Sequence, residues 1–245
     1  MVFLLLVSQA GMFHPESILR FADHLYTIGD YGAALQEYRR YSFLSDSLGR
    51  SIIERMIDCY VQTERFTDAY QTTERFTDRN YATYAKGYIL YKQTLFDSCR
   101  TCLEQVGIPH REKALTITGM SYAQQFDFKN AGRFIALPGA IPQHKSIAAG
   151  ALLSLFPGGG HLYCGRVGDG LFSCAVVGLS ALLATYYHSK DEDMKFGISL
   201  GATILFYAGN IYGGINAVRN YNYYVDDTYR NSLIGSTGPI DPFYR

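Results

Sequence analysis

Hydrophobic positions between Pro15 and Leu137 recur at helical spacing, and the alternation typical of strands is missing there. This spacing predicts amphipathic helices joined by short turns. After residue 145 the pattern changes, because residues 170–189 and 196–218 carry no formally charged side chain. At about 1.5 Å per residue, each run is long enough to cross a hydrocarbon core about 30 Å thick. The pattern predicts an all-α protein that ends in a two-helix transmembrane hairpin.

A short motif repeats within the amphipathic part of the chain. An aromatic residue is followed three positions later by a small one, at Tyr31/Ala34, Phe66/Ala69, Phe96/Cys99 and Phe128/Ala131. Because an apolar helical pattern precedes and follows each aromatic residue, we expect it to begin the second helix of a helix–turn–helix unit. The small residue would let the two helices approach closely. The spacings of 35, 30 and 32 residues between the aromatics indicate about four stacked units.

The first unit resembles a tetratricopeptide repeat, whose period is about 34 residues. The residues in family-like order are Ala22, Leu25, Tyr26, Gly29, Tyr31, Ala33, Ala34 and Tyr38. Later units lack the turn glycine and carry Glu64, Thr94 and Phe126 in its place. The resemblance implies a solenoid of helical hairpins with a concave surface for a peptide or partner helix. The alternative is a spacer or an oligomerisation module.

A glycine-rich turn lies ahead of the first apolar run. The apolar stretch 146–156 is too short to span, so it predicts an interfacial or partly re-entrant helix. The turn resembles the entry of the small two-transmembrane-helix domain family, and the chain as a whole is similar to bacterial envelope proteins of that kind. The predicted membrane motif comprises Pro157, Gly158, Gly160, His161, Tyr163, Gly165, Arg166 and Gly170. The second run lacks that family's Trp and Asp. The resemblance implies membrane insertion and no reaction.

Small residues four apart predict close packing of the two apolar runs. The ridges comprise Gly170, Cys174 and Gly178 on the first run, and Gly197, Gly201, Gly209 and Gly213 on the second. Such ridges let membrane helices pack backbone to backbone, either within the hairpin or in a dimer. Asn210 is expected to find a polar partner in the other helix.

Breaks in the pattern set the expected domain limits. Residues 1–14 resemble a truncated secretory signal, with an ordinary first helical turn as the alternative. Two prolines and a glycine make residues 138–145 a linker between the repeats (15–137) and the membrane domain (146–222). Residues 223–245 lack periodicity and contain glycines and prolines, so they predict a flexible tail.

Composition excludes several classes of function. Residues 1–145 carry 16 Lys and Arg against 15 Asp and Glu, and the rest carries 6 against 7, so a nucleic-acid surface is not expected. Cys99 and Cys102 have redox spacing without a surrounding strand–helix–strand pattern, and they are read as structural cysteines. The histidines show no metal-ligand spacing. Gly160 and Gly165 have the spacing of a phosphate loop, but Arg166 and Val167 replace its Lys and Ser/Thr.

These observations together predict a protein that is not an enzyme and needs no cofactor or metal. We expect a membrane-anchored scaffold that binds or recruits a partner protein at a bacterial envelope membrane. Its expected location is multi-pass in the inner membrane, with the repeats on the periplasmic side. The alternative is a small oligomeric pore or transport accessory formed by the glycine-ridged hairpin.

Overall fold

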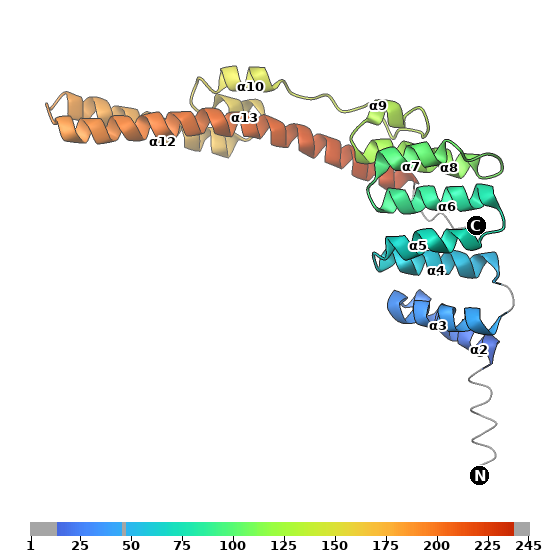
Figure 1. Ribbon diagram of the computed structural model, residues 1–245. Coiled ribbons are helices and arrows are strands. Elements are labelled where there is room, and N and C mark those ends of the chain that lie inside the picture. Colours follow the sequence, from blue (N-terminus) through green and yellow to red (C-terminus); the bar gives the residue numbers. More distant parts are fainter. Residues whose placement is uncertain (1–13, 46–47, 238–245) are drawn as a thin grey trace, which may run out of the picture. The chain divides into compact units, whose positions relative to one another are not determined.

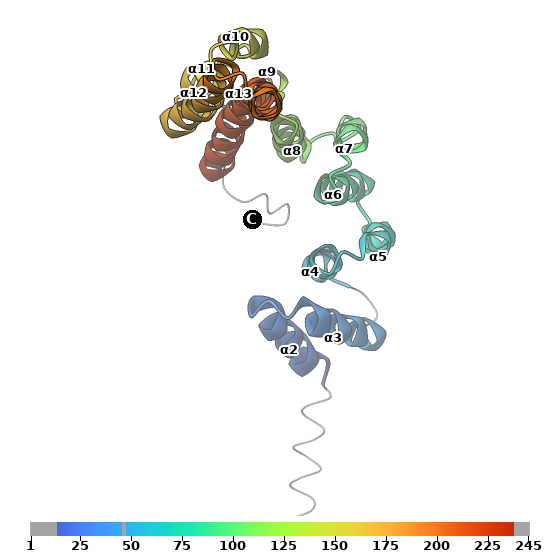
Figure 2. The same ribbon diagram turned by 90° about the vertical axis from the view of Figure 1, so that its left-hand side faces the viewer.

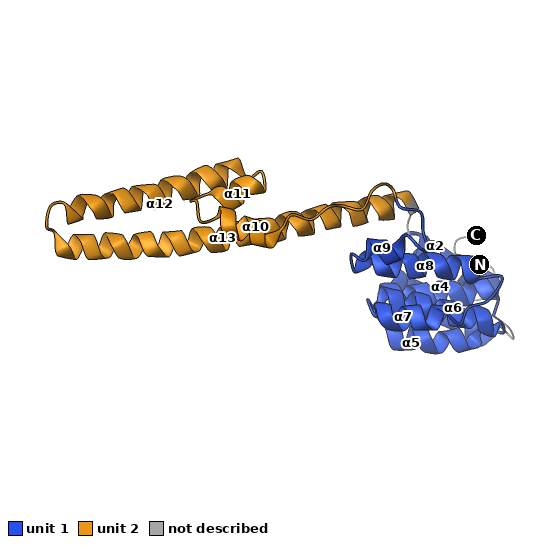
Figure 3. Cartoon of the chain, turned by 90° about the horizontal axis from the view of Figure 1, so that it is seen from above, with its two compact units in different colours: residues 1–137, 237–245 blue, residues 138–236 orange. Residues whose placement is uncertain are grey.

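In the computed structural model the chain is all-helical. The structure describes residues 14–45 and 48–237, and within these ranges no residue lies in a strand. The chain divides into two compact units, residues 1–137 with 237–245, and residues 138–236 (Figure 3). The predicted signal segment, residues 1–14, lies outside the described part except for His14, the N-cap residue of helix α2.

The first unit consists of helices that pack in chain order as pairs (Figure 1, Figure 2). The first helices of the pairs are α2 (Pro15–Thr27), α4 (Arg50–Gln62), α6 (Arg79–Lys92) and α8 (Arg111–Gln124). The second helices are α3 (Tyr31–Leu44), α5 (Phe66–Thr72), α7 (Phe96–Leu103) and α9 (Phe128–Ala131), and α5 continues into the 3-10 turn η1 (Thr73–Arg75). Each second helix begins at the aromatic residue of the repeated motif.

All four pairs use the same left-handed turn between their helices. The residue two positions before each aromatic has a positive φ, which is 82° at Gly29, 57° at Glu64, 61° at Thr94 and 61° at Phe126. In each turn the next N–H donates to a carbonyl five residues earlier, as in Asp30 to Leu25. This bond satisfies a carbonyl that the end of the first helix leaves open. The turn is therefore retained where glycine is absent, at the cost of a left-handed non-glycine residue.

Small residues bring the two helices of a pair together. The side chains of Ala34, Ala69, Cys99 and Ala131 are fully buried. Glycines in the first helices make a second set of close contacts: a Cβ added at Gly87 would lie 2.2 Å from Leu103, and one at Gly119 would lie 2.8 Å from Ile135. Gly87 and Gly119 stand nine residues before their aromatics, as Ala22 does in the first pair.

The second unit contains two short helices and two long ones. The short helices are α10 (Ile147–Leu153) and α11 (Gly159–Tyr163), and the long ones are α12 (Val167–His188) and α13 (Asp193–Thr237). A tight turn after His188 reverses the chain, so α12 lies beside the first half of α13 (Figure 1, Figure 3).

Both long helices are long and apolar enough to cross a membrane. In the most apolar stretch of each, only 17% of the residues are buried by the rest of the chain. The core helix of a water-soluble domain would be mostly covered, because exposing that much apolar surface to water is unfavourable. Leu171, Leu182, Ile204 and Leu205 are among the exposed side chains, each more than 60% accessible.

One expected boundary, the start of the tail, differs from the structure. Residues 223–237 belong to α13 and are not a flexible tail; the rest of that segment is outside the described residues. Side chains bond along this part of the helix, as Arg230 does to Asp227. Residues 138–145 contain no helix and begin at the boundary between the two units, and His144 Nε2 lies 2.8 Å from Asp226 Oδ2 of the same unit.

Candidate functional site

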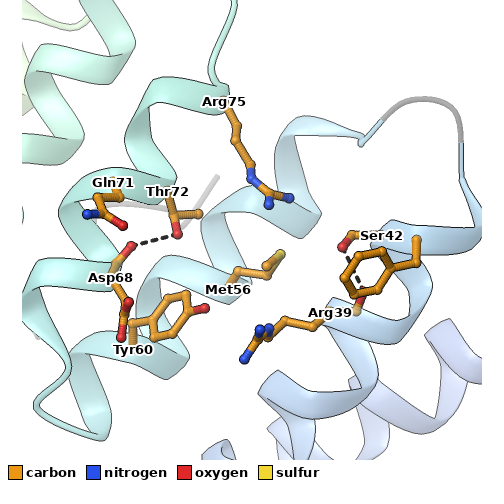
Figure 4. Close-up of a pocket in the computed structure, with 9 residues that line it drawn as sticks. Arg39, Ser42, Met56, Tyr60, Asp68, Gln71, Thr72 and Arg75 are labelled. Atoms are coloured by element: carbon orange, nitrogen blue, oxygen red, sulfur yellow. Dashed lines mark hydrogen bonds between the residues drawn. The ribbon is translucent and has the colours of Figure 1, made fainter.

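A pocket of about 330 Å³ opens between α3 and the second helix pair (Figure 4). Its lining residues are Arg39, Ser42, Phe43, Met56, Tyr60, Asp68, Gln71, Thr72 and Arg75. Met56 and Tyr60 of α4 are buried and form an apolar floor, whereas the ring of Phe43 is 84% exposed at the edge. Arg39 enters from α3 and Arg75 from η1, on different sides of Met56.

The charges around this pocket are unequally compensated. Asp68, the only carboxylate in its lining, lies 2.7 Å from Arg65. Glu37 pairs with Arg40 at 3.6 Å. Arg39 and Arg75 make no ion pair with any residue in the described ranges. The pocket therefore presents two uncompensated guanidinium groups above an apolar floor.

A polar network joins the first two helix pairs. Tyr38 of α3 donates a hydrogen bond to Asp23 at 2.7 Å, and Arg55 of α4 forms an ion pair with the same carboxylate. Tyr26 of α2 donates to Asp58 of α4 at 2.6 Å. Burial, together with the hydrogen bond to Asp23, raises the pKa of Tyr38. These bonds fix the register of the pocket walls, because α3 and α4 carry both the network and the lining.

Cys99 is fully buried within its pair, and burial raises the pKa of its thiol to about 12. Burial also raises the pKa of Cys102. A redox-active thiol requires a lowered pKa and access to its partner. The environment of Cys99 favours the neutral thiol and suits a packing residue. Among the residues that the structure describes, no three His, Cys, Asp or Glu side chains gather in a way that could hold a metal ion.

The glycine-rich turn of the predicted membrane motif is held by one side chain of α13. Asn210 Oδ1 accepts a hydrogen bond from the backbone N–H of Gly158 at 2.7 Å, and Asn210 Nδ2 donates to the carbonyl of Ser154 at 2.7 Å. Tyr207 donates to the carbonyl of Leu155 at 2.9 Å. Asn210 thus bonds to the turn between α10 and α11. The predicted partner in the other apolar helix, α12, is wrong, because the broken backbone of the turn offers open amide groups.

Glycines let α10, α11 and α13 approach to backbone contact. A Cβ added at Gly160 would lie 2.7 Å from Gly214 Cα and 2.1 Å from Ser154 Oγ. Gly158 has φ of 85°, and its Cβ would lie 2.1 Å from the carbonyl oxygen of Gly170. His161 is buried beside Gly213, and a Cβ at Gly213 would lie 3.0 Å from its Nε2.

The remaining motif residues lie in α11 or next to it. The carbonyl of Tyr163 accepts a hydrogen bond from Lys145 Nζ at 2.5 Å, and its hydroxyl accepts one from the N–H of Ser146. Gly165, two residues after the end of α11, has φ of 77°. Arg166, the N-cap of α12, pairs with Asp169 at 2.6 Å. Pro157 precedes the turn glycine Gly158. The motif thus connects α10, α11 and α12 through hydrogen bonds and close glycine contacts.

The long second half of α13 holds the segment that leads into α10. Asn222 accepts from the N–H of Lys145 at 2.8 Å and donates to its carbonyl at 2.9 Å. Tyr229 donates to the carbonyl of Gly139 at 2.8 Å. These contacts were not predicted from the sequence, although the polar side chains at 222, 226 and 229 follow helical spacing on α13.

Most of the glycines predicted to pack the two apolar helices against each other make no close contact in the structure. A Cβ added at Gly178, Gly197, Gly201 or Gly209 would meet no heavy atom within 4 Å, and Cys174 is exposed. These residues do not bring α12 and α13 together. Gly213 and Gly170 do make close contacts, but with His161 and Leu162 near α11. Gly213 contacts His161 because α11 packs on that face of α13.

Comparison of the chain with protein-family models, with curated proteins and with solved structures gave no match.

Proposed function

We propose that the chain is a membrane-anchored helical-repeat scaffold that binds a partner protein. In this proposal the first unit is a tetratricopeptide-like solenoid, and α12 with the first half of α13 is a two-span hairpin. The observation that carries it is the low burial of the two apolar helices, which need an apolar medium to cover them. The repeats of the first unit supply the pocket for the partner.

The α10–α11 element supports this assignment. Broken backbone at membrane depth requires protein partners for its amide groups. Asn210 and Tyr207 provide such partners for Gly158, Ser154 and Leu155. In the proposed arrangement this element lies against the hairpin at the membrane boundary and fixes the point where α12 enters the lipid.

Two antiparallel spans place both ends of the chain on one side of the membrane. We propose a bacterial inner membrane with the repeats on the periplasmic side. Protease added to sealed inverted vesicles should leave the repeats intact, and protease added to spheroplasts should digest them. The opposite pattern would place the repeats in the cytoplasm without affecting the scaffold proposal.

Fractionation and proximity labelling test the proposal itself. The full chain should sediment with membranes, resist extraction at high pH and dissolve in detergent. A labelling enzyme fused before residue 15 should then mark the same partner protein in repeated experiments. A chain that stays in the supernatant without detergent, folded and monodisperse, would falsify the membrane assignment. Labelling without a reproducible partner would contradict the scaffold assignment.

The uncovered glycines support a second candidate, an oligomeric pore or transport accessory. Gly197, Gly201 and Gly209 lie on a face of α13 that no described residue covers closely. Small residues on an open face allow helices of neighbouring copies to pack. This candidate predicts that the purified chain forms oligomers in detergent, and that the substitution Gly201→Leu dissociates these oligomers. It also predicts that the chain conducts ions when reconstituted into lipid bilayers. A monomer with no conductance contradicts it.

A further inference from the structure

The pocket between α3 and the second helix pair has the chemistry of a site for an acidic peptide. We propose that it binds a linear segment of the partner protein in which an apolar side chain is flanked by Asp or Glu. The apolar side chain contacts the exposed ring of Phe43, and the carboxylates pair with Arg39 and Arg75. This inference rests on the proposed scaffold function and specifies the partner's chemistry.

The charge pattern favours an anionic occupant. Carboxylates near the pocket already have cationic partners: Asp68 pairs with Arg65, Glu37 with Arg40, and Glu74 with Arg79 at 3.0 Å and with Lys86. Arg39 and Arg75 alone among the charged lining residues have no such partner in the described ranges. A guanidinium binds a carboxylate through two parallel hydrogen bonds, which a neutral ligand cannot reproduce.

The apolar part of the pocket favours a peptide over a simple anion. Met56 and Tyr60 at the base are only 1% and 6% exposed, so the apolar surface open to a ligand is mainly that of Phe43. A volume of about 330 Å³ accommodates an apolar side chain with neighbouring backbone. The ring of Phe43, exposed at the edge, extends the apolar surface beyond the pocket. An inorganic anion would leave this surface uncovered, whereas an amphipathic segment covers it.

The walls are also fixed before the ligand arrives. Arg55 and Tyr38 hold α3 and α4 together through Asp23. Thr72 donates to the carbonyl of Asp68 at 2.7 Å, which ties down the wall from α5 (Figure 4). A rigid wall reduces the ordering cost of binding, because only the peptide and the two arginine side chains lose freedom.

Peptide binding to the full chain in phosphatidylcholine nanodiscs tests this inference. The probes are fluorescent peptides with a central Leu or Phe between Glu residues, the same peptides with Gln for Glu, and the same with Ser for the central residue. We expect the acidic apolar peptides to bind, and both substituted forms to bind at least about tenfold more weakly. Added salt should weaken binding, since the arginines are exposed.

Two variants locate the site. Arg39→Gln combined with Arg75→Gln should weaken binding of the acidic peptide at least about tenfold. Arg111→Gln, which removes an exposed arginine from the start of α8, should bind as the wild type does. Because all three side chains are on the surface, the variants should fold normally, which circular dichroism verifies.

The results separate this inference from the scaffold function. Three results would overturn the acidic-peptide site. They are equal binding of the acidic and Gln peptides, unchanged peptide binding by the double variant, and binding of no peptide at all. Binding of the chain to anionic phosphatidylglycerol vesicles through Arg39 and Arg75, without peptide binding, would assign the pocket to lipid and also overturn it. If proximity labelling recovers the same partner from the double variant, the scaffold stands and the pocket is not its site.

Discussion

Asn210 Oδ1 accepts a hydrogen bond of 2.7 Å from the N–H of Gly158, 52 residues earlier in the chain. The same side chain donates to the carbonyl of Ser154. One amide group thus satisfies both a donor and an acceptor at the break between α10 and α11. This relationship connects the glycine-rich turn to α13, and it explains why a polar residue is retained in an apolar helix.

Replacing Asn210 should therefore loosen the second unit. Asn210→Leu leaves the N–H of Gly158 and the carbonyl of Ser154 buried without this partner, and we expect a loss of about 2 kcal/mol in the free energy of unfolding. Titration of the full chain with sodium dodecyl sulfate in mixed micelles measures it. The matched control is Asn216→Leu, because no described residue is hydrogen-bonded to the Asn216 side chain. Equal losses in both variants would contradict the role of Asn210.

The glycines of α13 should differ sharply in their tolerance of a methyl group. A Cβ at Gly214 would lie 1.9 Å from Ser154 Oγ, whereas one at Gly209 meets nothing within 4 Å. Gly214→Ala should cost about 1–3 kcal/mol of unfolding free energy by overpacking, and Gly209→Ala should be neutral. Ser154→Gly should restore part of the stability of Gly214→Ala in a double-mutant cycle. Independent effects of the two substitutions would show that the contact is not made.

The left-handed turns offer stabilising substitutions. Thr94 has φ of 61°, a strained conformation for a β-branched residue. Thr94→Gly should raise the free energy of unfolding by about 0.5–1 kcal/mol, because the strain relieved exceeds the added flexibility of the unfolded chain. Thr101→Gly in the interior of α7 should instead lower it by a similar amount. Denaturant unfolding followed by circular dichroism compares them, and destabilisation by Thr94→Gly would contradict the strain argument.

Stability should fall in alkaline solution through two buried tyrosines. Burial raises the pKa of Tyr38 and Tyr81, and hydrogen bonds to Asp23 and Glu54 add to the effect. The unfolded chain loses these protons near pH 10, while the folded chain keeps them to higher pH. Their contribution is thus complete below about pH 10 and is lost as pH rises further, at about 1.4 kcal/mol per pH unit for each residue.

Denaturant midpoints measured from pH 9 to pH 11 test this dependence. Tyr38→Phe should remove up to about half of the slope above pH 10, since one of the two titrating groups is gone. Tyr70→Phe removes a hydroxyl from an exposed ring and should keep the wild-type slope. A Tyr38→Phe variant with the full wild-type slope would exclude Tyr38 as a source of the pH dependence.

The helical elements of the first unit and the two apolar helices could be predicted from the order of residues alone. Periodicity depends on neighbouring residues alone, so Tyr31, Phe66, Phe96 and Phe128 indicate where α3, α5, α7 and α9 begin. The small residues three positions later indicate the buried contact within each pair. Residues 170–189 and 196–218 carry no formal charge, and this likewise predicts the two long apolar helices.

Contacts between residues far apart in the chain could not be predicted, because they depend on how the helices pack. Asn210 could have faced α12, but α11 folds back onto α13, so its partners are Gly158 and Ser154. Arg39 and Arg75 are ordinary surface residues in the sequence and become a pair of cations only because α3 and η1 line the same pocket. Side-chain spacing fixes the face of a helix on which a residue lies, whereas the neighbour on that face depends on how the whole chain packs.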